Sequence, residues 1–130
     1  MRRILNLTPH KINIYRGWQD VLYVLPSDGN VRLREVTEPA APMVLWEPAV
    51  PEWDDFCERV PVVRKTYGNP EFSGTLPDSG DVVIVSGLAG PVVRRALGGD
   101  TRVLSPDTGP DSVVRDSEGK ILGVRRFIEW

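Results

Sequence analysis

Short runs in which apolar and polar residues alternate recur along most of the chain, and Gly, Pro or Asp bounds nearly every run. Alternation with a period of two places every second side chain on one face of a β-strand. Such runs are shorter than ordinary helices, so they predict many short strands separated by turns. The main expected strands lie at residues 5–7, 12–14, 21–25, 31–36, 60–67, 82–85, 101–104, 112–115 and 120–127.

The first four runs predict an antiparallel arrangement. Thr8-Pro9-His10 separates the first two runs and favours a turn, because proline presets the backbone for one. We therefore expect residues 5–7 and 12–14 to form a hairpin with one apolar face. Pro26-Ser27-Asp28-Gly29 predicts a further turn, with proline at its second position and glycine free to take a positive φ. Residues 1–36 are expected to form an antiparallel meander.

Residues 82–85 are four β-branched apolar residues in a row, which indicates a strand buried on both faces. A helix should cover one of those faces, and residues 86–97 are the candidate. Pro91 suits its first turn, and the following valines, Ala96 and Leu97 form an apolar stripe. The predicted fold class is therefore α+β, with a mainly antiparallel β-sheet and one short principal helix packed on it.

Residues 37–59 differ from the rest because they contain four prolines and two tryptophans. Proline is excluded from central strands, so this segment is predicted to be a surface excursion with at most one helical turn. Trp46 or Trp53 is expected to be largely buried, either on the core or against a partner. With 130 residues in all, the chain is predicted to be a single domain that carries this excursion.

Charge and composition exclude several classes of function. Sixteen basic against eighteen acidic residues give a net charge of −2, which argues against nonspecific nucleic-acid binding. One Cys and one His exclude an intrachain disulfide framework and the common zinc sites, so neither metal nor cofactor is expected. The sequence contains no long apolar run and no recognisable secretion signal, so we expect a cytoplasmic protein that does not enter membranes.

Asp107-Thr108-Gly109 matches the active triplet of aspartic proteases. Such enzymes need two carboxylates that share a proton and a glycine-rich flap, and too few residues separate Gly109 from Ile121-Leu122-Gly123 to form one. Pro106 and Pro110 bracket the triplet and favour a tight loop. Two interpretations remain, a turn in which Asp107 bonds the following backbone, and a rigid polar loop that binds a ligand.

Two further features are compatible with a site. His10 is the only histidine, so any Ser–His or Cys–His chemistry must use it; otherwise it is a turn residue. Cys57 lies among acidic residues, which favours a structural thiol. Gly87-Leu88-Ala89-Gly90 stands between a buried strand and a helix, where a phosphate could bind, yet it lacks the remaining residues of either nucleotide motif. A plain helix entry is the alternative.

Thirteen of the sixteen basic residues are Arg, whose planar fork binds carboxylates and phosphates with two hydrogen bonds. They form either a solvated surface of mixed charge or an anion-binding pocket. If strands 60–67 and 101–104 are neighbours, the pocket would combine cationic forks, a stacking ring and a hydroxyl. The predicted ligand-binding residues are Arg64, Tyr67, Arg102, Asp107, Thr108 and, at the rim, His10.

The order of motifs along the chain resembles a family of small, mostly uncharacterised proteins encoded by tailed phages, prophages and actinobacterial genomes. Asn6-Leu7-Thr8-Pro9-His10 opens the pattern, and Ser105-Pro106-Asp107-Thr108-Gly109-Pro110 and Ile121-Leu122-Gly123 stand near its end. The resemblance implies an accessory protein of phage biology, located in the host cytoplasm or in the virion.

Three functions follow as hypotheses. The first is a non-enzymatic protein that binds, and so sequesters, a small nucleotide-like anion such as a defence signal. The second is a minor virion or assembly protein that docks a partner, or a second copy, through the segment containing Trp46 and Trp53. The third is a hydrolase that uses His10 with a carboxylate.

Overall fold

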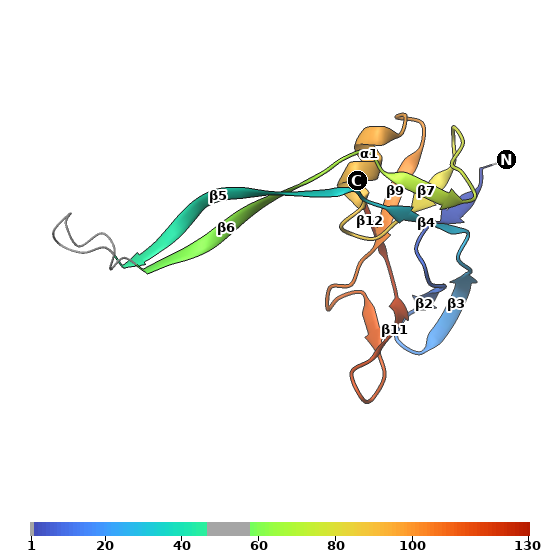
Figure 1. The fold of residues 1–130 in the computed structure, drawn as a ribbon. Coiled ribbons are helices and arrows are strands. Elements are labelled where there is room, and N and C mark those ends of the chain that lie inside the picture. Colours follow the sequence, from blue (N-terminus) through green and yellow to red (C-terminus); the bar gives the residue numbers. More distant parts are fainter. Residues whose placement is uncertain (1, 47–57) are drawn as a thin grey trace, which may run out of the picture. The chain divides into compact units, whose positions relative to one another are not determined.

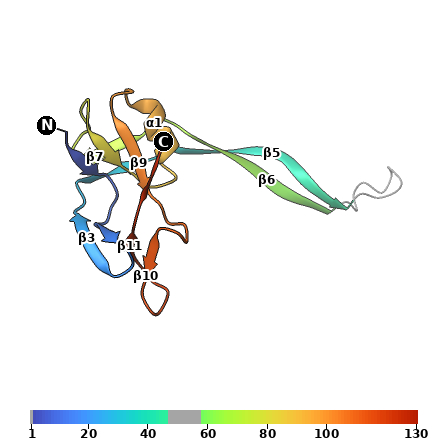
Figure 2. The same cartoon turned by 180° about the vertical axis from the view of Figure 1, so that it is seen from behind.

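The computed structural model describes residues 2–46 and 58–130, and it is 52% strand with one short helix (Figures 1 and 2). The β-rich fold with a single short helix, expected from the alternating runs, is confirmed for these residues. The chain divides into two compact units, one formed by residues 1–34 and 69–130 and the other by residues 35–68.

The first unit is built around a four-stranded sheet, here called sheet A, whose order is β1-β8-β9-β12. Strands β1, β8 and β9 run parallel, with Ile4 opposite Val82 and Val82 opposite Arg102. Strand β12 is antiparallel to β9. The sheets are thus mixed, and the expectation of a mainly antiparallel sheet is wrong. A helical crossover returns the chain to the same end of the sheet before β9 begins, which makes β8 and β9 parallel. The strands are β1 (Ile4–Asn6), β8 (Val82–Ile84), β9 (Arg102–Pro106) and β12 (Phe127–Glu129).

Helix α1 (Gly90–Ala96) is this crossover, and it covers one face of sheet A as predicted. Pro91 stands at its start, where its missing N–H costs nothing, and the valines of its apolar stripe are buried. Val83 and Val85 of the central strand pack with Val93 of the helix in one core cluster. The helix ends at Leu97, whose backbone is extended and whose N–H bonds the backbone oxygen of Val93.

Sheet B, the second sheet of this unit, has the order β10-β11-β2-β3. β10 and β11 are antiparallel, with Val114 opposite Gly123, whereas β11 and β2 run parallel. A second core cluster joins Ile12, Leu25 and Val124 of this sheet to Ile84 of sheet A. The strands are β2 (Ile12–Arg16), β3 (Asp20–Leu25), β10 (Val113–Arg115) and β11 (Ile121–Val124).

The predicted N-terminal meander is only partly correct. β2 and β3 form the expected antiparallel pair, but β1 pairs with β8 in the other sheet, so no hairpin joins β1 to β2. β4 (Gly29–Arg32) also leaves the meander and pairs with β7 (Glu71–Gly74). Gly29 and Gly74 face each other so closely that a Cβ on Gly29 would overlap the backbone oxygen of Ser73, which requires glycine there.

The second unit is an antiparallel ribbon of β5 (Glu35–Trp46) and β6 (Glu58–Tyr67). β6 confirms the strand predicted at residues 60–67, whereas residues 37–46, assigned to an irregular excursion, belong to β5. Proline is tolerated because both strands of a two-stranded ribbon are edges. Pairing is irregular between Ala40 and Met43, where Pro42 interrupts the ladder.

Part of the predicted excursion cannot be compared with this ribbon. The side chain of Trp46 and all of Trp53 and Cys57 lie outside the described residues, so the expected burial of a tryptophan stays a prediction. Within the described ranges, no helix is long and apolar enough to cross a membrane.

Candidate functional site

The turn after β1 is organised by the buried amide of Asn6, which is fully enclosed. Its Nδ2 donates hydrogen bonds to the backbone oxygens of His10, at 2.9 Å, and Leu25, at 3.1 Å. Its Oδ1 accepts from the backbone N–H of Thr8 at 3.1 Å and lies 2.6 Å from the Thr8 hydroxyl oxygen. One amide thus ties the Asn-Leu-Thr-Pro-His turn to the end of β3 and carries the chain from sheet A to sheet B.

A second turn follows β9 and is organised by Asp107. Its Oδ1 accepts from the backbone N–H of Gly109 at 2.9 Å, which confirms the interpretation of Asp-Thr-Gly as a turn of this kind. Its Oδ2 accepts from Nε of Arg126 at 2.5 Å. The hydrogen bond from Arg126, and then the one from Gly109, hold the pKa of Asp107 below its usual value. The carboxylate is therefore occupied in holding the loop that presents Thr108.

A third element is the Trp130 side chain, which follows β12. Its indole Nε1 donates to Oγ of buried Ser105 at 2.8 Å, and that hydroxyl donates to the backbone oxygen of Ser86 at 3.1 Å. The ring lies against Gly90 so closely that a Cβ there would overlap it. These contacts hold the ring in place while 38% of the residue stays exposed.

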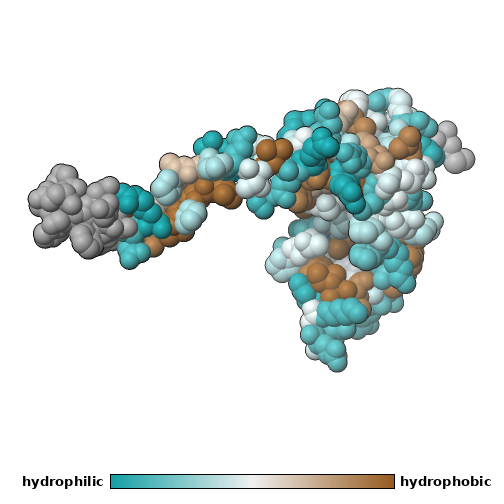
Figure 3. Space-filling model, in the orientation of Figure 1, coloured by the Kyte–Doolittle hydropathy of each residue, from teal (hydrophilic) through white to brown (hydrophobic). Residues whose placement is uncertain are grey.

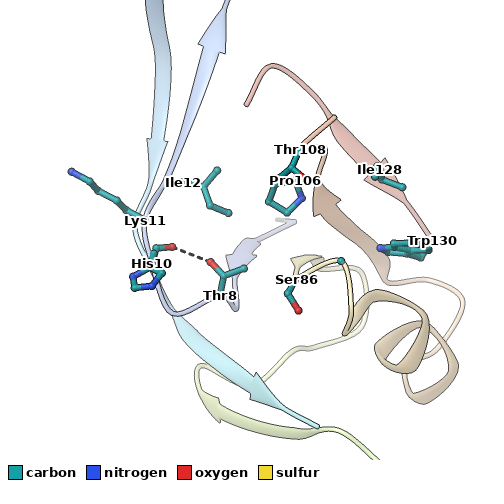
Figure 4. Close-up of a pocket in the computed structure, with 10 residues that line it drawn as sticks. Thr8, His10, Lys11, Ile12, Ser86, Pro106, Thr108, Ile128 and Trp130 are labelled. Atoms are coloured by element: carbon teal, nitrogen blue, oxygen red, sulfur yellow. Dashed lines mark hydrogen bonds between the residues drawn. The ribbon is translucent and has the colours of Figure 1, made fainter. Parts of the chain in front are cut away.

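The three elements surround one cleft of about 410 Å³, here called the Trp130 cleft. Figure 4 shows Trp130 and Ile128 on one side, His10 and Lys11 on the other, and Ile12 and Pro106 between them. The cleft lies where parallel strands β1, β8 and β9 end, which is the usual place for ligands in such sheets. Its lining residues are Thr8, His10, Lys11, Ile12, Ser86, Gly87, Pro106, Thr108, Ile128 and Trp130.

A second hollow of about 310 Å³ extends the Trp130 cleft along strands β2 and β11. The two share one wall, formed by the residues from His10 to Ile12 together with Pro106 and Thr108. The extension ends at residues 121–124 of β11. The two adjoining hollows therefore have room for a ligand with two parts rather than for a single ion alone.

The lining chemistry of the cleft favours an anion with an apolar or aromatic body. Ile12, Pro106, Ile128 and the Trp130 ring supply apolar surface, and Lys11 supplies a cation. None of the lining residues that the structure describes has an acidic side chain. An anion would meet an ammonium and hydroxyls there without an acidic side chain among the described lining residues.

The structure brings together only part of the predicted site. His10 and Thr108 line the cleft, and Asp107 holds the adjacent loop. Arg102 does not line the Trp130 cleft. Its guanidinium donates hydrogen bonds to both carboxylate oxygens of Glu129, at 2.9 and 3.2 Å. The hydrogen bonds to Glu129 raise the pKa of Arg102 and keep that fork occupied.

The assumed adjacency of strands 60–67 and 101–104 is wrong. β9 has β8 and β12 as its neighbours in sheet A, whereas β6 pairs with β5. Strand order depends on contacts between distant segments, which alternation within one segment does not contain. Arg64 and Tyr67 belong to the second unit, and their part in a ligand site stays a prediction.

Sequence reasoning missed Lys11 and Trp130 as site residues. Lys11 directly follows His10, and the prediction of His10 as a site residue already indicated this part of the chain. Gly87 begins the loop that was considered as a phosphate site and Ser86 precedes it, and both residues line the cleft. Trp130 offered no local signal, because only its long-range bond to Ser105 shows that the ring is held.

Metal and acid–base chemistry gain no support from this geometry. Nowhere in the described ranges do three His, Cys, Asp or Glu side chains group as a metal site. No family model, curated protein or solved structure matches the chain. The function is therefore inferred from the Trp130 cleft itself, beside the resemblance that the motifs suggest.

Proposed function

We propose that this protein binds a small nucleotide-like anion in the Trp130 cleft and acts by holding the ligand rather than by converting it. The observation that carries the proposal is a fixed, partly exposed tryptophan and a lysine on the walls of one cleft whose described lining holds no acidic side chain. The resemblance to phage-encoded proteins favours an accessory role in which the bound anion is a signal that the protein sequesters.

The Trp130 ring suits the base of such a ligand. Stacking a base on an aromatic side chain contributes about 1–3 kcal/mol, and it tolerates any base because each has a π-face. The ring is already held by Ser105 and Gly90, so little conformational entropy is lost when a ligand stacks on it. The cleft volume of about 410 Å³ falls within the usual range for small-molecule sites.

The hydroxyls of the cleft favour binding over catalysis. The Thr8 hydroxyl lies 2.9 Å from the backbone oxygen of His10 and is engaged within its own turn. The Ser86 hydroxyl accepts from the backbone N–H of Ala89 at 3.3 Å. A hydrolase that used His10 would need a nucleophile or carboxylate in hydrogen-bond contact with the imidazole, and no described residue makes such a bond with it.

The test is a thermal-shift and calorimetric screen of mononucleotides, ADP-ribose derivatives and cyclic dinucleotides. A ligand at 100 times its dissociation constant adds about 2.7 kcal/mol, which raises the melting temperature by about 5–15 °C for a chain of this size. Lys11→Gln and Trp130→Leu should each weaken binding about tenfold or more. Lys120→Gln changes an exposed lysine outside the cleft and is the matched control.

Three results would contradict the proposal. Absence of a shift with every compound, or equal binding by the parent and Lys11→Gln, would leave docking as the better function. Turnover of a bound compound that disappears in His10→Gln would favour the hydrolase instead.

One observation favours docking as a second candidate. The β5–β6 ribbon carries exposed apolar side chains, visible in Figure 3, among them Met43, Leu45 and Val63, which are 52%, 63% and 54% exposed. Exposed apolar surface of this kind is typical of interaction sites. If the ribbon docks a second copy or a virion partner, Leu45→Asp should abolish the association measured by sedimentation velocity, whereas Leu76→Asp, an exposed leucine of the other unit, should not.

A further inference from the structure

A larger hollow, of about 650 Å³, opens in the first unit between sheets A and B. It lies on the face of sheet A that points away from α1, at the ends where the parallel strands begin. It is lined by different residues from the Trp130 cleft and adjoins none of the predicted site residues except Arg102. It is called the amino-end hollow below.

Because of the register of sheet A, the charged and the apolar residues that line the hollow lie at different ends of the same sheet face. Ile4, Val82 and Arg102 form one row across the three parallel strands, and Ile84 and Leu104 lie two residues further along the same face. Arg2 precedes Ile4 by two residues and also lines the hollow. The guanidinium-bearing residues thus lie toward the outer end of this face, and the aliphatic residues lie deeper.

Several apolar side chains on the walls of the amino-end hollow are exposed to water. Ile4, Leu22 and Tyr23 are 55%, 52% and 60% exposed, although they surround a floor in which Ile84 is buried. A concave apolar surface of this volume is within the range of small-molecule sites. Covering it would remove these side chains from water, and each buried methylene group of a ligand would contribute about 0.8 kcal/mol.

The charge at the outer end determines which kind of ligand fits. Arg102 is neutralised by the two hydrogen bonds from its guanidinium to Glu129. Arg2 makes no side-chain hydrogen bond or ion pair with another described residue, and no carboxylate is found among the described lining residues. One uncompensated positive charge therefore stands beside an apolar hollow.

We propose that the amino-end hollow is a second binding site, independent of the Trp130 cleft, for an amphipathic small molecule with an aliphatic body and a single anionic head. The body lies on Ile4, Leu22 and Phe127, and the head meets Arg2. Medium-chain carboxylates are the chemical class that fits both features. The hollow has aliphatic residues in its inner part and a cationic residue at its outer end, and one strand register produces both. This arrangement distinguishes the site from a nonspecific hydrophobic surface.

The experiment uses the full chain and the fluorescent probe anilinonaphthalene sulfonate, which combines an apolar body with one negative charge. Dodecanoate, below its micellar concentration, should displace the probe about tenfold more effectively than dodecanol or dodecyltrimethylammonium, because only dodecanoate has the complementary head. Leu22→Asp should abolish displacement. Leu76→Asp is its matched control, because Leu76 is 62% exposed and does not line the hollow.

Arg2→Gln tests the head separately from the body. It should reduce dodecanoate affinity about three- to tenfold and leave dodecanol unchanged, whereas Arg95→Gln, an exposed arginine of α1, should change neither. Lys11→Gln should leave dodecanoate binding intact, which separates this site from the proposed nucleotide site. Circular dichroism melting of each variant shows that it is folded.

Three results would overturn the proposal. One is failure of dodecanoate to displace the probe from the parent protein, and another is equal displacement by the cationic amphiphile. The third is a parent dimer in sedimentation velocity that Leu22→Asp converts to a monomer, because a second copy of the chain would then be the occupant of the hollow.

Discussion

The two ends of the parallel strands in sheet A differ in chemistry although the same strands form both. At their carboxyl ends, the Asn6 turn, the Ser86 loop and the Asp107 loop surround a cleft with polar rims. At their amino ends, the amino-end hollow is mainly aliphatic, with arginines at its outer end. Parallel strands share a direction, so the turns that follow them gather at one end, and polar side chains used to shape those turns gather with them.

The two proposed sites also differ in what holds them together. The carboxyl-end cleft depends on side-chain-to-backbone hydrogen bonds, which single substitutions can remove. The amino-end hollow depends on strand register and apolar packing, which the same substitutions leave in place. Changes at the Asn6, Gly90 and Asp107 positions should therefore affect nucleotide-like binding and leave dodecanoate binding largely unchanged.

The largest effect is expected from Asn6→Ala. The change leaves the backbone oxygens of His10 and Leu25 and the N–H of Thr8 without their buried partner. Each unsatisfied buried group costs about 1–3 kcal/mol, so we expect a loss of about 2–5 kcal/mol in the free energy of unfolding. Urea denaturation measures it, and exposed Asn69→Ala is the control, with an expected change below about 0.5 kcal/mol. A loss no larger than in the control would show that the turn does not depend on this amide.

A smaller effect is expected from Gly90→Ala. The new Cβ would overlap the Trp130 ring, which must move and give up its hydrogen bond to Ser105. We expect about 1–3 kcal/mol of destabilisation together with a red shift of tryptophan emission. In a Trp130→Ala background the same substitution has no ring to meet and should be neutral or stabilising, since alanine favours helix over glycine. Equal destabilisation in both backgrounds would contradict the packing of Trp130 on Gly90.

The smallest effect is expected from Asp107→Asn, and it depends on pH. Because Arg126 lowers the pKa of Asp107 in the folded protein, the ionised form contributes stability above the unfolded pKa, and this is lost as pH falls through the folded pKa. The variant should melt lower than the parent at pH 7, and the difference should shrink as pH falls below about 4. Asp100→Asn, which removes an exposed carboxylate on a turn outside this loop, is the matched control. A difference that stays constant from pH 7 to pH 3 would argue against the ion pair.

Much of the local structure was predictable. The alternating runs placed β3, β6 and β9 to within about two residues, because the pattern of a strand is carried by residues within it. The single strand expected at residues 120–127 is wrong, since the chain divides there into β11 and β12 of different sheets. The continuous apolar run at residues 82–85 indicated the buried central strand and its covering helix. Asp107-Thr108-Gly109 indicated a turn because the side chain bonds a backbone group two residues away.

The candidate site was less predictable for a physical reason. His10 and Thr108 were identified from their turns, but Trp130 joins them through a hydrogen bond to a residue 25 positions earlier. Arg102 was assigned to the same pocket because its strand was assumed to lie beside residues 60–67, and it lies instead at the amino-end hollow. Prolines 39 and 42 argued against a strand, yet an isolated ribbon accepts them at its edges.

Local rules therefore determined where most of the strands lie, where the helix lies and how the Asp107 loop turns, but not that residues 37–46 form a strand. The tertiary structure decided that β1 leaves β2 for β8, that the sheets are mixed, and which side chains meet at each end of the parallel strands. The reason is that strand pairing is chosen by hydrogen bonds and packing between distant segments. A buried amide such as Asn6, which bonds both its own turn and the end of β3, redirects the chain without changing the alternation on either side.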